Sequence, residues 1–364
     1  MQTLPFLPLD LPFAAPLTKL AYQTFGQSKN VFSIAHKEWS DRVRQIVDPP
    51  QQQKTSKIDD QMLAMLQARF DQLLETDWED AQQGIYPTSL LFDNPWDEFF
   101  SFYPAVWLDA PKTWRRSNQR RYQEFSESID TTGFPKYYLQ NFHHQSDGYL
   151  SETSANLYDL QVELLFGGTA DAMRRRVLAP IKQGLQQFND ILPQHTRMVD
   201  IACGTGRTIK MLRAAFPQAS LHGTDLSPAY LRKANQLLSQ NPGELPQLVQ
   251  ANAETLPYQD NQFHAVTSVF LFHELPAVVR QTIINECFRI AKPKGVFVLC
   301  DSVQVSDSPE MEAFMKNFPA VFHEPYYRHY STDNLEERLQ QAGFTDIHTE
   351  VHFMSKYWVA HKPA

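Results

Sequence analysis

Residues 199–208, "VDIACGTGRT", join an apolar run to two closely spaced glycines, Gly204 and Gly206. A buried strand that enters a glycine turn and then a helix is typical of nucleotide-binding α/β units, because glycine accepts a positive φ and lets a ligand approach the backbone. Asp225 follows Gly204 by 21 residues, close to the offset of ~20 residues at which a carboxylate binds both ribose hydroxyls. The stretch therefore predicts a nucleotide site, without identifying the nucleotide.

Around this turn, predicted strands and helices alternate. Apolar runs predict strands, and helical spacing predicts helices between them. The strands are 197–203, 220–225, 246–252, 263–272, 295–303, 344–353 and 355–363, and the helices are 205–216, 227–239, 276–291 and 331–343. Such alternation predicts a mostly parallel sheet with helices on both faces. The turn between the last two strands is too short for a crossover, so these strands must be antiparallel. We therefore expect a doubly wound, Rossmann-like α/β fold whose seven-stranded sheet has an antiparallel last strand.

Residues 1–150 differ in composition and pattern: they are rich in Gln and aromatic residues and show no alternating strands. We expect a mainly helical N-terminal cap or accessory domain. Its expected parts are an extended arm before residue 20, an exposed loop at 48–57, an irregular aromatic segment at 94–107, and helices at 58–83 and 110–128. Residues 151–364 would form the second domain. Its expected parts are covering helices at 151–190 (151–166 and 169–188), a nucleotide-binding core at 197–302 and a substrate-side insertion at 306–330.

The composition excludes several classes of protein. The net charge is −8, which makes the chain a poor binder of phosphate backbones, so no nucleic-acid substrate is expected. No apolar run reaches the ~18 residues of a membrane span, and the proline-broken N-terminus lacks the basic region of a signal peptide. Three widely spaced cysteines without a C-x-x-C pair argue against disulfides and zinc, and favour a cytoplasmic location.

The sequence resembles the class I S-adenosylmethionine-dependent methyltransferases in four motifs. The glycine turn resembles their first motif, and three later stretches follow in the family's order. These are "GTDLSPAYLRKA" (223–234) for the acidic loop, "ANAETLPYQDNQFHAVTSVFLFHELP" (251–276) from the adenine contact through the fourth strand, and "AKPKGVFVLCDS" (291–302) for the fifth strand. With "YDLQVELLFGGTADAMRRR" (158–176) upstream, the chain is most similar to the small-molecule methyltransferases of ubiquinone and menaquinone biosynthesis.

The resemblance implies S-adenosyl-L-methionine as the cofactor and S-adenosyl-L-homocysteine as the product. The implied cofactor contacts are Asp200, Gly204, Gly206, Asp225, Leu226, Asn252, Ala253, Glu254, Val269 and Arg175. Asp225 would hold the ribose diol, and Arg175 or one of its neighbours, Arg174 and Arg176, would pair with the methionine carboxylate. A solvated helix face is the alternative for these arginines. Ala202 stands where the fuller glycine pattern has its first glycine.

Methyl transfer from a sulfonium needs a positioned acceptor and a group that takes or orients the acceptor's proton. His273 is the first candidate for that base or orienting group, because it ends the fourth strand and imidazole titrates near neutral pH. A hydrogen-bonded wall histidine is the alternative. His143 and Tyr149 are further catalytic candidates, and the substrate-side candidates are Glu274, His144, His323, Tyr326, Tyr327 and Tyr330. The adjacent His143 and His144 cannot both face the pocket, and no metal site is predicted because neither histidine-rich segment has a helical i, i+4 His pair.

The aromatic insertion favours a flat acceptor that is a quinone, a phenol or a tetrapyrrole-like compound, methylated on C or O. The N-terminal region would cap the pocket, form a homodimer interface or dock a partner, and these alternatives stay open. Two rival functions also stay open. A non-catalytic adenosylmethionine-binding sensor or assembly factor would lose the acceptor-side polar groups. A nicotinamide dehydrogenase would have a third glycine where this chain has Ile209, and a parallel sixth strand.

Overall fold

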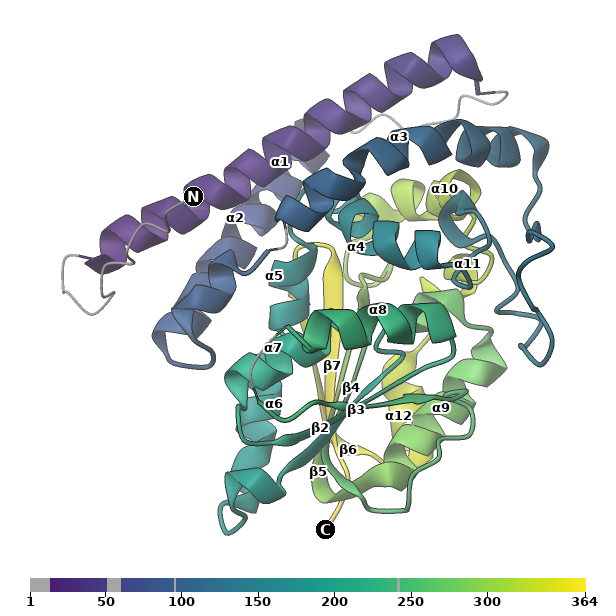
Figure 1. Cartoon of the computed structure of the whole chain (residues 1–364). Coiled ribbons are helices and arrows are strands. Elements are labelled where there is room, and N and C mark those ends of the chain that lie inside the picture. Colours follow the sequence, from purple (N-terminus) through teal and green to yellow (C-terminus); the bar gives the residue numbers. More distant parts are fainter. Residues whose placement is uncertain (1–13, 51–59, 95, 241–242) are drawn as a thin grey trace.

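A seven-stranded sheet flanked by helices forms the centre of the computed structural model, which describes residues 14–50, 60–94, 96–240 and 243–364 (Figure 1). The strands lie in the order β3-β2-β1-β4-β5-β7-β6. They are β1 (Arg197–Ile201), β2 (Ser220–Asp225), β3 (Gln247–Gln250), β4 (Phe263–Val269), β5 (Ala291–Ser302), β6 (Thr345–His352) and β7 (Ser355–His361). β1 to β5 pair in parallel, whereas β7 is antiparallel to both β5 and β6. The predicted fold, with its antiparallel last strand, is confirmed.

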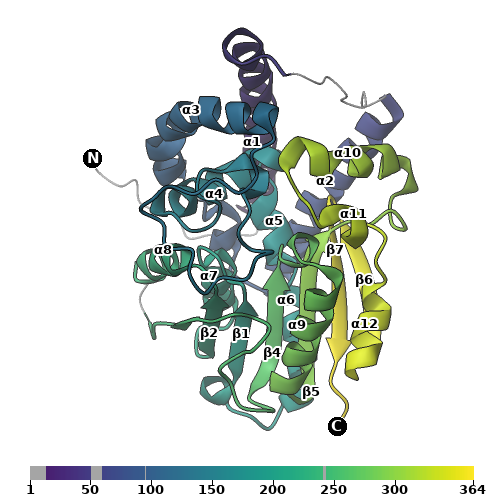
Figure 2. The same ribbon diagram turned by 90° about the vertical axis from the view of Figure 1, so that its right-hand side faces the viewer.

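Alternate residues of each strand serve opposite faces of the sheet. Met198 and Val298 pack on one face, and their neighbours Val199 and Phe297 pack on the other. The first face is covered by α6 (Leu178–Gly184), α7 (Arg207–Ala215) and α8 (Pro228–Leu238), and the second by α9 (Ala277–Ile290) and α12 (Leu335–Ala342) (Figures 1 and 2). Both faces are buried, as expected for parallel strands in a doubly wound fold.

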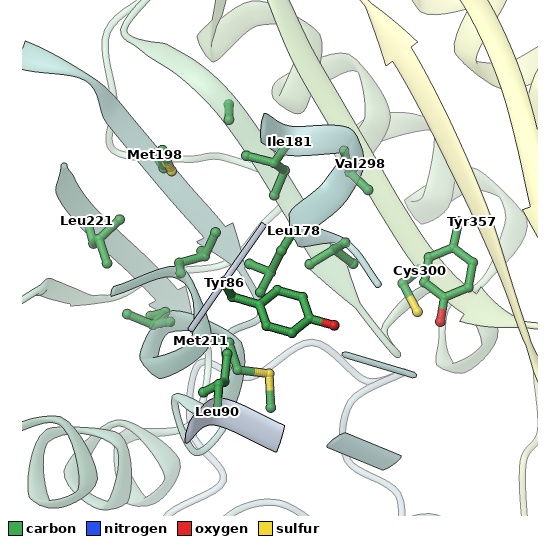
Figure 3. Close-up of a cluster of buried hydrophobic side chains, with 14 of the residues drawn as sticks. Tyr86, Leu90, Leu178, Ile181, Met198, Met211, Leu221, Val298, Cys300 and Tyr357 are labelled. Atoms are coloured by element: carbon green, nitrogen blue, oxygen red, sulfur yellow. The ribbon is translucent and has the colours of Figure 1, made fainter. Parts of the chain in front are cut away.

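The N-terminal region is mainly helical, as predicted, and it completes the core of the first face. Its elements are α1 (Ala14–Val47), α2 (Asp60–Gln82), η1 (Thr88–Phe92), α3 (Trp96–Gln119) and η2 (Phe142–His144), and it is followed along the chain by α4 (Glu152–Leu165) and α5 (Ala170–Arg175). Figure 3 shows Tyr86 and Leu90 from this region among buried side chains of α6, α7 and the sheet. Because these side chains share one core with the sheet, the N-terminal helices are held at a fixed position beside it.

Several local predictions in the N-terminal half were wrong. Residues 14–20 belong to the helix α1, not to an extended arm, and the segment 94–107 is not irregular because α3 begins at Trp96. α3 continues through Pro104 and Pro111 to Gln119, short of the predicted end at 128. Each proline removes a helical N–H donor. The helix persists because tertiary packing overrides propensity: for example, the rings of Trp96 and Tyr103 lie 5.9 and 5.5 Å from that of Phe32.

Other boundaries also differ from the predictions. The single helix expected at 169–188 is three pieces, α5, α6 and η3 (Leu185–Phe188), and a short η4 (Pro193–His195) precedes the sheet. The insertion after β5 holds η6 (Pro309–Met311), α10 (Glu312–Phe322) and α11 (Tyr327–Tyr330), and η5 (Phe272–Glu274) follows β4. Most of the expected loop at 48–57, the start of the helix expected at 58–83 and the first part of the arm lie outside the described residues.

A buried ion pair joins the N-terminal helices to the rest of the fold. Asp77 on α2 and Arg175 on α5 are both buried, and their charged atoms lie 2.5 Å apart. The hydroxyl groups of Tyr22 and Tyr86 also donate to the Asp77 carboxylate. Removing either partner of such a buried ion pair destabilises the fold strongly, because the other charge is left buried without a partner. In the described part of the chain, no helix is both long enough and apolar enough to cross a membrane.

Candidate active site

A cavity opens at the carboxyl ends of the parallel strands, the edge where doubly wound folds bind ligands. Loops after β1, β2, β3 and β4 form one side, and the N-terminal region and α4 form the other. Its lining residues are Tyr137, Tyr138, Tyr149, Tyr158, Ala202, Gly204, Asp225, Leu226, Tyr230, Ala251, Asn252, Ala253, Val269, Phe270, Leu271, Glu274, Leu275 and Ile283. Eight of the predicted site residues are among them: Gly204, Asp225, Leu226, Asn252, Ala253, Val269, Tyr149 and Glu274.

Asp225 ends β2 and is fixed by backbone donors. The N–H groups of Gly204 and Ser227 each donate to its carboxylate at 2.8 Å. Burial raises the pKa of Asp225 to about 6, although these backbone hydrogen bonds oppose the shift. The carboxylate is therefore held in one orientation at the cavity wall, with capacity to accept further hydrogen bonds.

The backbone of the glycine turn lines part of the cavity. Gly204 has φ +53°, and a Cβ there would meet only the Tyr230 ring at 3.9 Å, so its face toward the cavity is open. Gly206 has φ +83° and caps α7; it does not line the cavity, and a Cβ there would lie 3.0 Å from that of Ala234. Ala202 also has a positive φ, +57°. Ala202 stands where the fuller pattern has its first glycine, and it adopts the positive φ that is typical of glycine.

Asp200 lies on β1 and is not one of the cavity's lining residues. Its Oδ1 is buried without a hydrogen-bond partner among the described residues. Burial, and then the charge of Asp225, raise the pKa of Asp200. An orphaned buried oxygen at this point is a group that a ligand's donor would satisfy.

The side of the cavity expected to hold adenine is formed by Leu226, Asn252 and Ala253. Glu254 is not in the wall: its Oε1 accepts from the Tyr137 hydroxyl at 2.8 Å and from Asn252 Nδ2 at 3.2 Å. Glu254 therefore supports Asn252 and the tyrosine, and the sequence motif alone gave no sign of the tyrosine partner.

The three consecutive arginines point to different partners. Arg175 is engaged by Asp77 away from the cavity, which corrects its expected contact with the cofactor, and Arg176 pairs with Asp80. Arg174 is the one whose guanidinium lies 5.6 Å from the ring of Phe270, a cavity residue. Successive helical side chains point about 100° apart, so a run of arginines cannot act together.

Five tyrosines form a wall of the cavity. Tyr137, Tyr138 and Tyr149 come from the N-terminal region, Tyr158 from α4 and Tyr230 from α8. Their rings meet edge-on, with centroids 5.5 Å apart for Tyr149–Tyr230 and for Tyr158–Tyr230. Of this wall only Tyr149 was predicted. Tyr137 and Tyr138 lie in a segment without a motif, whereas Tyr158 and Tyr230 lie within two of the family-like stretches, at positions for which the resemblance implied no contact.

A polar cluster adjoins the cavity at Glu274, one of its lining residues. Glu274, on η5, accepts from the Tyr149 hydroxyl and has its Oε1 3.9 Å from the Nε2 of both His143 and His273. His143 Nε2 also lies 3.0 Å from an oxygen of Glu324, which follows α10. Burial, and then the Glu324 charge, raise the pKa of Glu274 to about 8. Burial alone would lower the pKa of His143, but the two carboxylates raise it.

His273 is oriented by Asp301, a residue near the end of β5 that was not among the predicted site residues. Its Nδ1 lies 2.6 Å from Asp301 Oδ1, and the N–H of Phe272 donates to the other oxygen at 2.6 Å. Burial would lower the pKa of His273, but Asp301 raises it to about 10. With its pKa raised in this way, His273 fits the orienting role better than that of a base.

The remaining predicted residues surround the cluster or lie outside it. As expected for adjacent residues, His144 does not join His143: its Nε2 lies 3.1 Å from the Val321 carbonyl. His323 stacks on Tyr122 at 3.9 Å. Tyr327 and Tyr330 meet His273 edge-on, at 6.2 and 6.1 Å, and Tyr326 packs near Tyr149 and Phe142. These tyrosines line no part of the cavity.

Comparison with known proteins agrees with this geometry. A methyltransferase domain model matches residues 198–295. A demethylmenaquinone methyltransferase of Anoxybacillus flavithermus is 26% identical over 213 residues, covering 52% of this chain and 86% of the relative. A methyltransferase of Synechocystis sp. is 32% identical over 154 residues, covering 42% of this chain and 68% of the relative.

The chain belongs to the class I S-adenosylmethionine-dependent methyltransferases. It is an enzyme of this family, uses S-adenosylmethionine, and within the family resembles the menaquinone and ubiquinone type. Among solved structures, human N-acetylserotonin methyltransferase in complex with SAM has a TM-score of 0.48 at 13% identity, covering 73% of this chain and 70% of that one.

Proposed function

We propose that this methyltransferase transfers the methyl group to an oxygen or carbon of a small aromatic or conjugated acceptor: a quinol, a phenol or a tetrapyrrole-like compound. The observation that carries the proposal is the cavity itself, whose lining includes the oriented carboxylate of Asp225, five tyrosines, and Glu274, which belongs to the polar cluster. We name the part of the cavity around Asp225 its first, or cofactor, end and the part around Glu274 its second, or acceptor, end. An apolar, aromatic cavity with few convergent polar groups suits a flat ligand that must be held in one orientation.

The residues at the first end fit the cofactor. Asp225 is positioned to accept from the two ribose hydroxyls, the Gly204 backbone leaves room for close approach, and the orphaned Asp200 oxygen would take a donor such as the methionine amino group. Leu226, Asn252 and Ala253 would line the adenine, and Arg174 replaces Arg175 as the arginine proposed near the methionine carboxylate. The bound cofactor supplies an electrophilic methyl group on sulfur.

The second end would hold and orient the acceptor. Phe270 and the tyrosine wall exclude water from the reacting atoms, and Glu274 with Tyr149 can bind an acceptor hydroxyl. His273, fixed by Asp301, would donate to an acceptor oxygen and stabilise the negative charge that makes that oxygen or its ring a nucleophile. Orientation of this kind is most of what a protein must contribute when the electrophile is supplied.

The quinone-type acceptor has support of its own. The relative from Anoxybacillus flavithermus is a demethylmenaquinone methyltransferase, and a naphthoquinol is flat, apolar and carries a hydroxyl. The net charge of −8 favours such a small molecule over nucleic acid. Buried, unpaired cysteines at 203, 287 and 300, all within the described residues, support a reducing, cytoplasmic location.

The domain boundaries are part of the same proposal. Residues 1–150 would be the cap and 151–364 the methyltransferase domain. Tyr137, Tyr138 and Tyr149 in the cavity wall support the capping role over a role only in homodimer formation or partner docking.

The test is methyl transfer from labelled S-adenosylmethionine by the full-length protein to a panel of naphthoquinols, phenols and tetrapyrroles, with mass spectrometry of cell extracts in parallel. We expect a product heavier by one methylene group that appears only when the protein is present. Cofactor binding without transfer to any member of the panel, and without such a pair in extracts, would favour the non-catalytic sensor or assembly factor instead.

A further inference from the structure

Three side chains from distant segments converge beside the acceptor end of the cavity. His143 comes from η2, Glu274 from η5 after β4, and Glu324 from the turn between α10 and α11. One ligand-type atom from each lies within 4.8 Å of the others. The Nε2 of His143 is 3.0 Å from an oxygen of Glu324 and 3.9 Å from Glu274 Oε1.

Glu324 provides an independent observation. Its side chain is wholly buried, and neither carboxylate oxygen has a hydrogen-bond partner among the described residues. Buried carboxylates normally accept several hydrogen bonds, because an unsatisfied charge in a low-dielectric interior is costly. His143 approaches only one of the two oxygens as a charge partner. Glu324 is therefore an incompletely satisfied charge that faces the other two side chains.

We propose that His143, Glu274 and Glu324 bind a divalent transition-metal cation, of the kind represented by Zn²⁺ and Mn²⁺. One imidazole nitrogen and two carboxylate oxygens form a mixed donor set that suits these ions better than Mg²⁺ or Ca²⁺, which prefer oxygen ligands alone. Ligands of one ion at bond lengths of about 2.0–2.2 Å lie roughly 3–4 Å apart, so small side-chain rotations would close the site.

The position of the site gives the cation a role in activating the acceptor. Glu274 lines the cavity and bridges it to the cluster, so a three-ligand ion would keep an open position toward the acceptor, as catalytic metal sites do. An acceptor hydroxyl bound there would lose its proton more easily. This role rests on the proposed function, whereas the binding of the ion does not.

Metal binding is measured on the full-length protein after dialysis against a chelator. We expect calorimetry with ZnCl2 or MnCl2 to show one ion per chain with a Kd of about 10 µM or tighter. Co²⁺ should give the visible absorption of an ion with nitrogen and oxygen ligands. Glu324→Gln and His143→Gln should each weaken binding by about 100-fold.

Two controls keep the result interpretable. Glu337→Gln changes an exposed carboxylate on α12 and should leave metal affinity unchanged. Unchanged S-adenosylmethionine affinity in the two ligand variants would show that the fold is intact. Absence of binding by all three metals, or equal binding by wild type and both ligand variants, would overturn the proposal in favour of a plain His143–Glu324 ion pair. Metal binding without methyl transfer to the phenol and quinol panel would contradict the proposed function alone.

Discussion

The two ends of the cavity are built in different ways. At the cofactor end, the backbone turns after β1, β2 and β3 form most of the lining. Asp225 is fixed there by two N–H groups within the same α/β unit. At the acceptor end, side chains from η2, η5 and the α10–α11 turn meet through contacts across the fold. The cofactor end therefore depends on local backbone geometry, whereas the acceptor end depends on correct docking of the N-terminal region.

The largest expected effect tests that docking. Asp77→Ala should destabilise the protein by about 3–5 kcal/mol, because it leaves the buried Arg175 charge without its partner. Urea unfolding measures the change. Asp60→Ala, an exposed position on the same helix, is the control. Loss of methyl transfer at a lower urea concentration than loss of cofactor binding would sharpen the difference between the two ends, and an unchanged unfolding midpoint would contradict the role of the pair.

The next effect concerns the cofactor end alone. Asp225→Ala should weaken S-adenosylmethionine binding by roughly 100- to 1,000-fold, since charge-assisted hydrogen bonds are worth about 1.5–3 kcal/mol each. Calorimetry measures the affinity. Asp260→Ala, on an exposed turn, should have no effect. Unchanged S-adenosylmethionine affinity in Asp225→Ala would contradict the proposed contact between Asp225 and the ribose.

The matching change at the acceptor end is Glu274→Gln. We expect kcat to fall about 100-fold while cofactor affinity changes less than about threefold, because Glu274 contacts Tyr149 and the histidines but not the cofactor turns. Steady-state kinetics and calorimetry on one preparation separate the two effects. Glu127→Gln, at an exposed site, is the control. An equal loss of cofactor affinity would break the distinction between the two ends.

The two ends also differ in how far the sequence predicted them. Gly204 follows a predicted strand, and Asp225 and Asn252 end two others. Because the carboxyl ends of parallel strands meet at one edge, the positions of these residues followed from the strand pattern. Glu274 and His273 were predictable for the same reason. The pairing of His143 with Glu324 was not, because both lie in segments without a period or a strand end. The first half of α3 was missed because its prolines argue against a helix that aromatic packing nevertheless stabilises.

The pH dependence of cofactor binding offers a smaller test. With a pKa of about 6, Asp225 is ionised at pH 7.5 and mostly protonated at pH 5, and only the ionised form accepts from both ribose hydroxyls. S-adenosylmethionine should therefore bind about tenfold more weakly at pH 5 than at pH 7.5. Calorimetry at both values measures this, and Asp225→Asn should bind weakly with a flatter profile. An equally steep profile in Asp225→Asn would assign the dependence to the neighbouring Asp200, whose pKa is also raised.

The smallest effect tests the claim that backbone geometry governs the cofactor end. Ala202 has φ +57°, and an L-residue in the left-handed region costs about 1–2 kcal/mol that glycine avoids. Glycine loses part of this gain through its larger unfolded-state entropy, so Ala202→Gly should stabilise the protein by about 1 kcal/mol and raise Tm by roughly 2 °C. Ala214→Gly, inside α7, should shift Tm in the opposite direction because its backbone is helical. A lower Tm in both variants would show that the alanine conformation at 202 carries no strain.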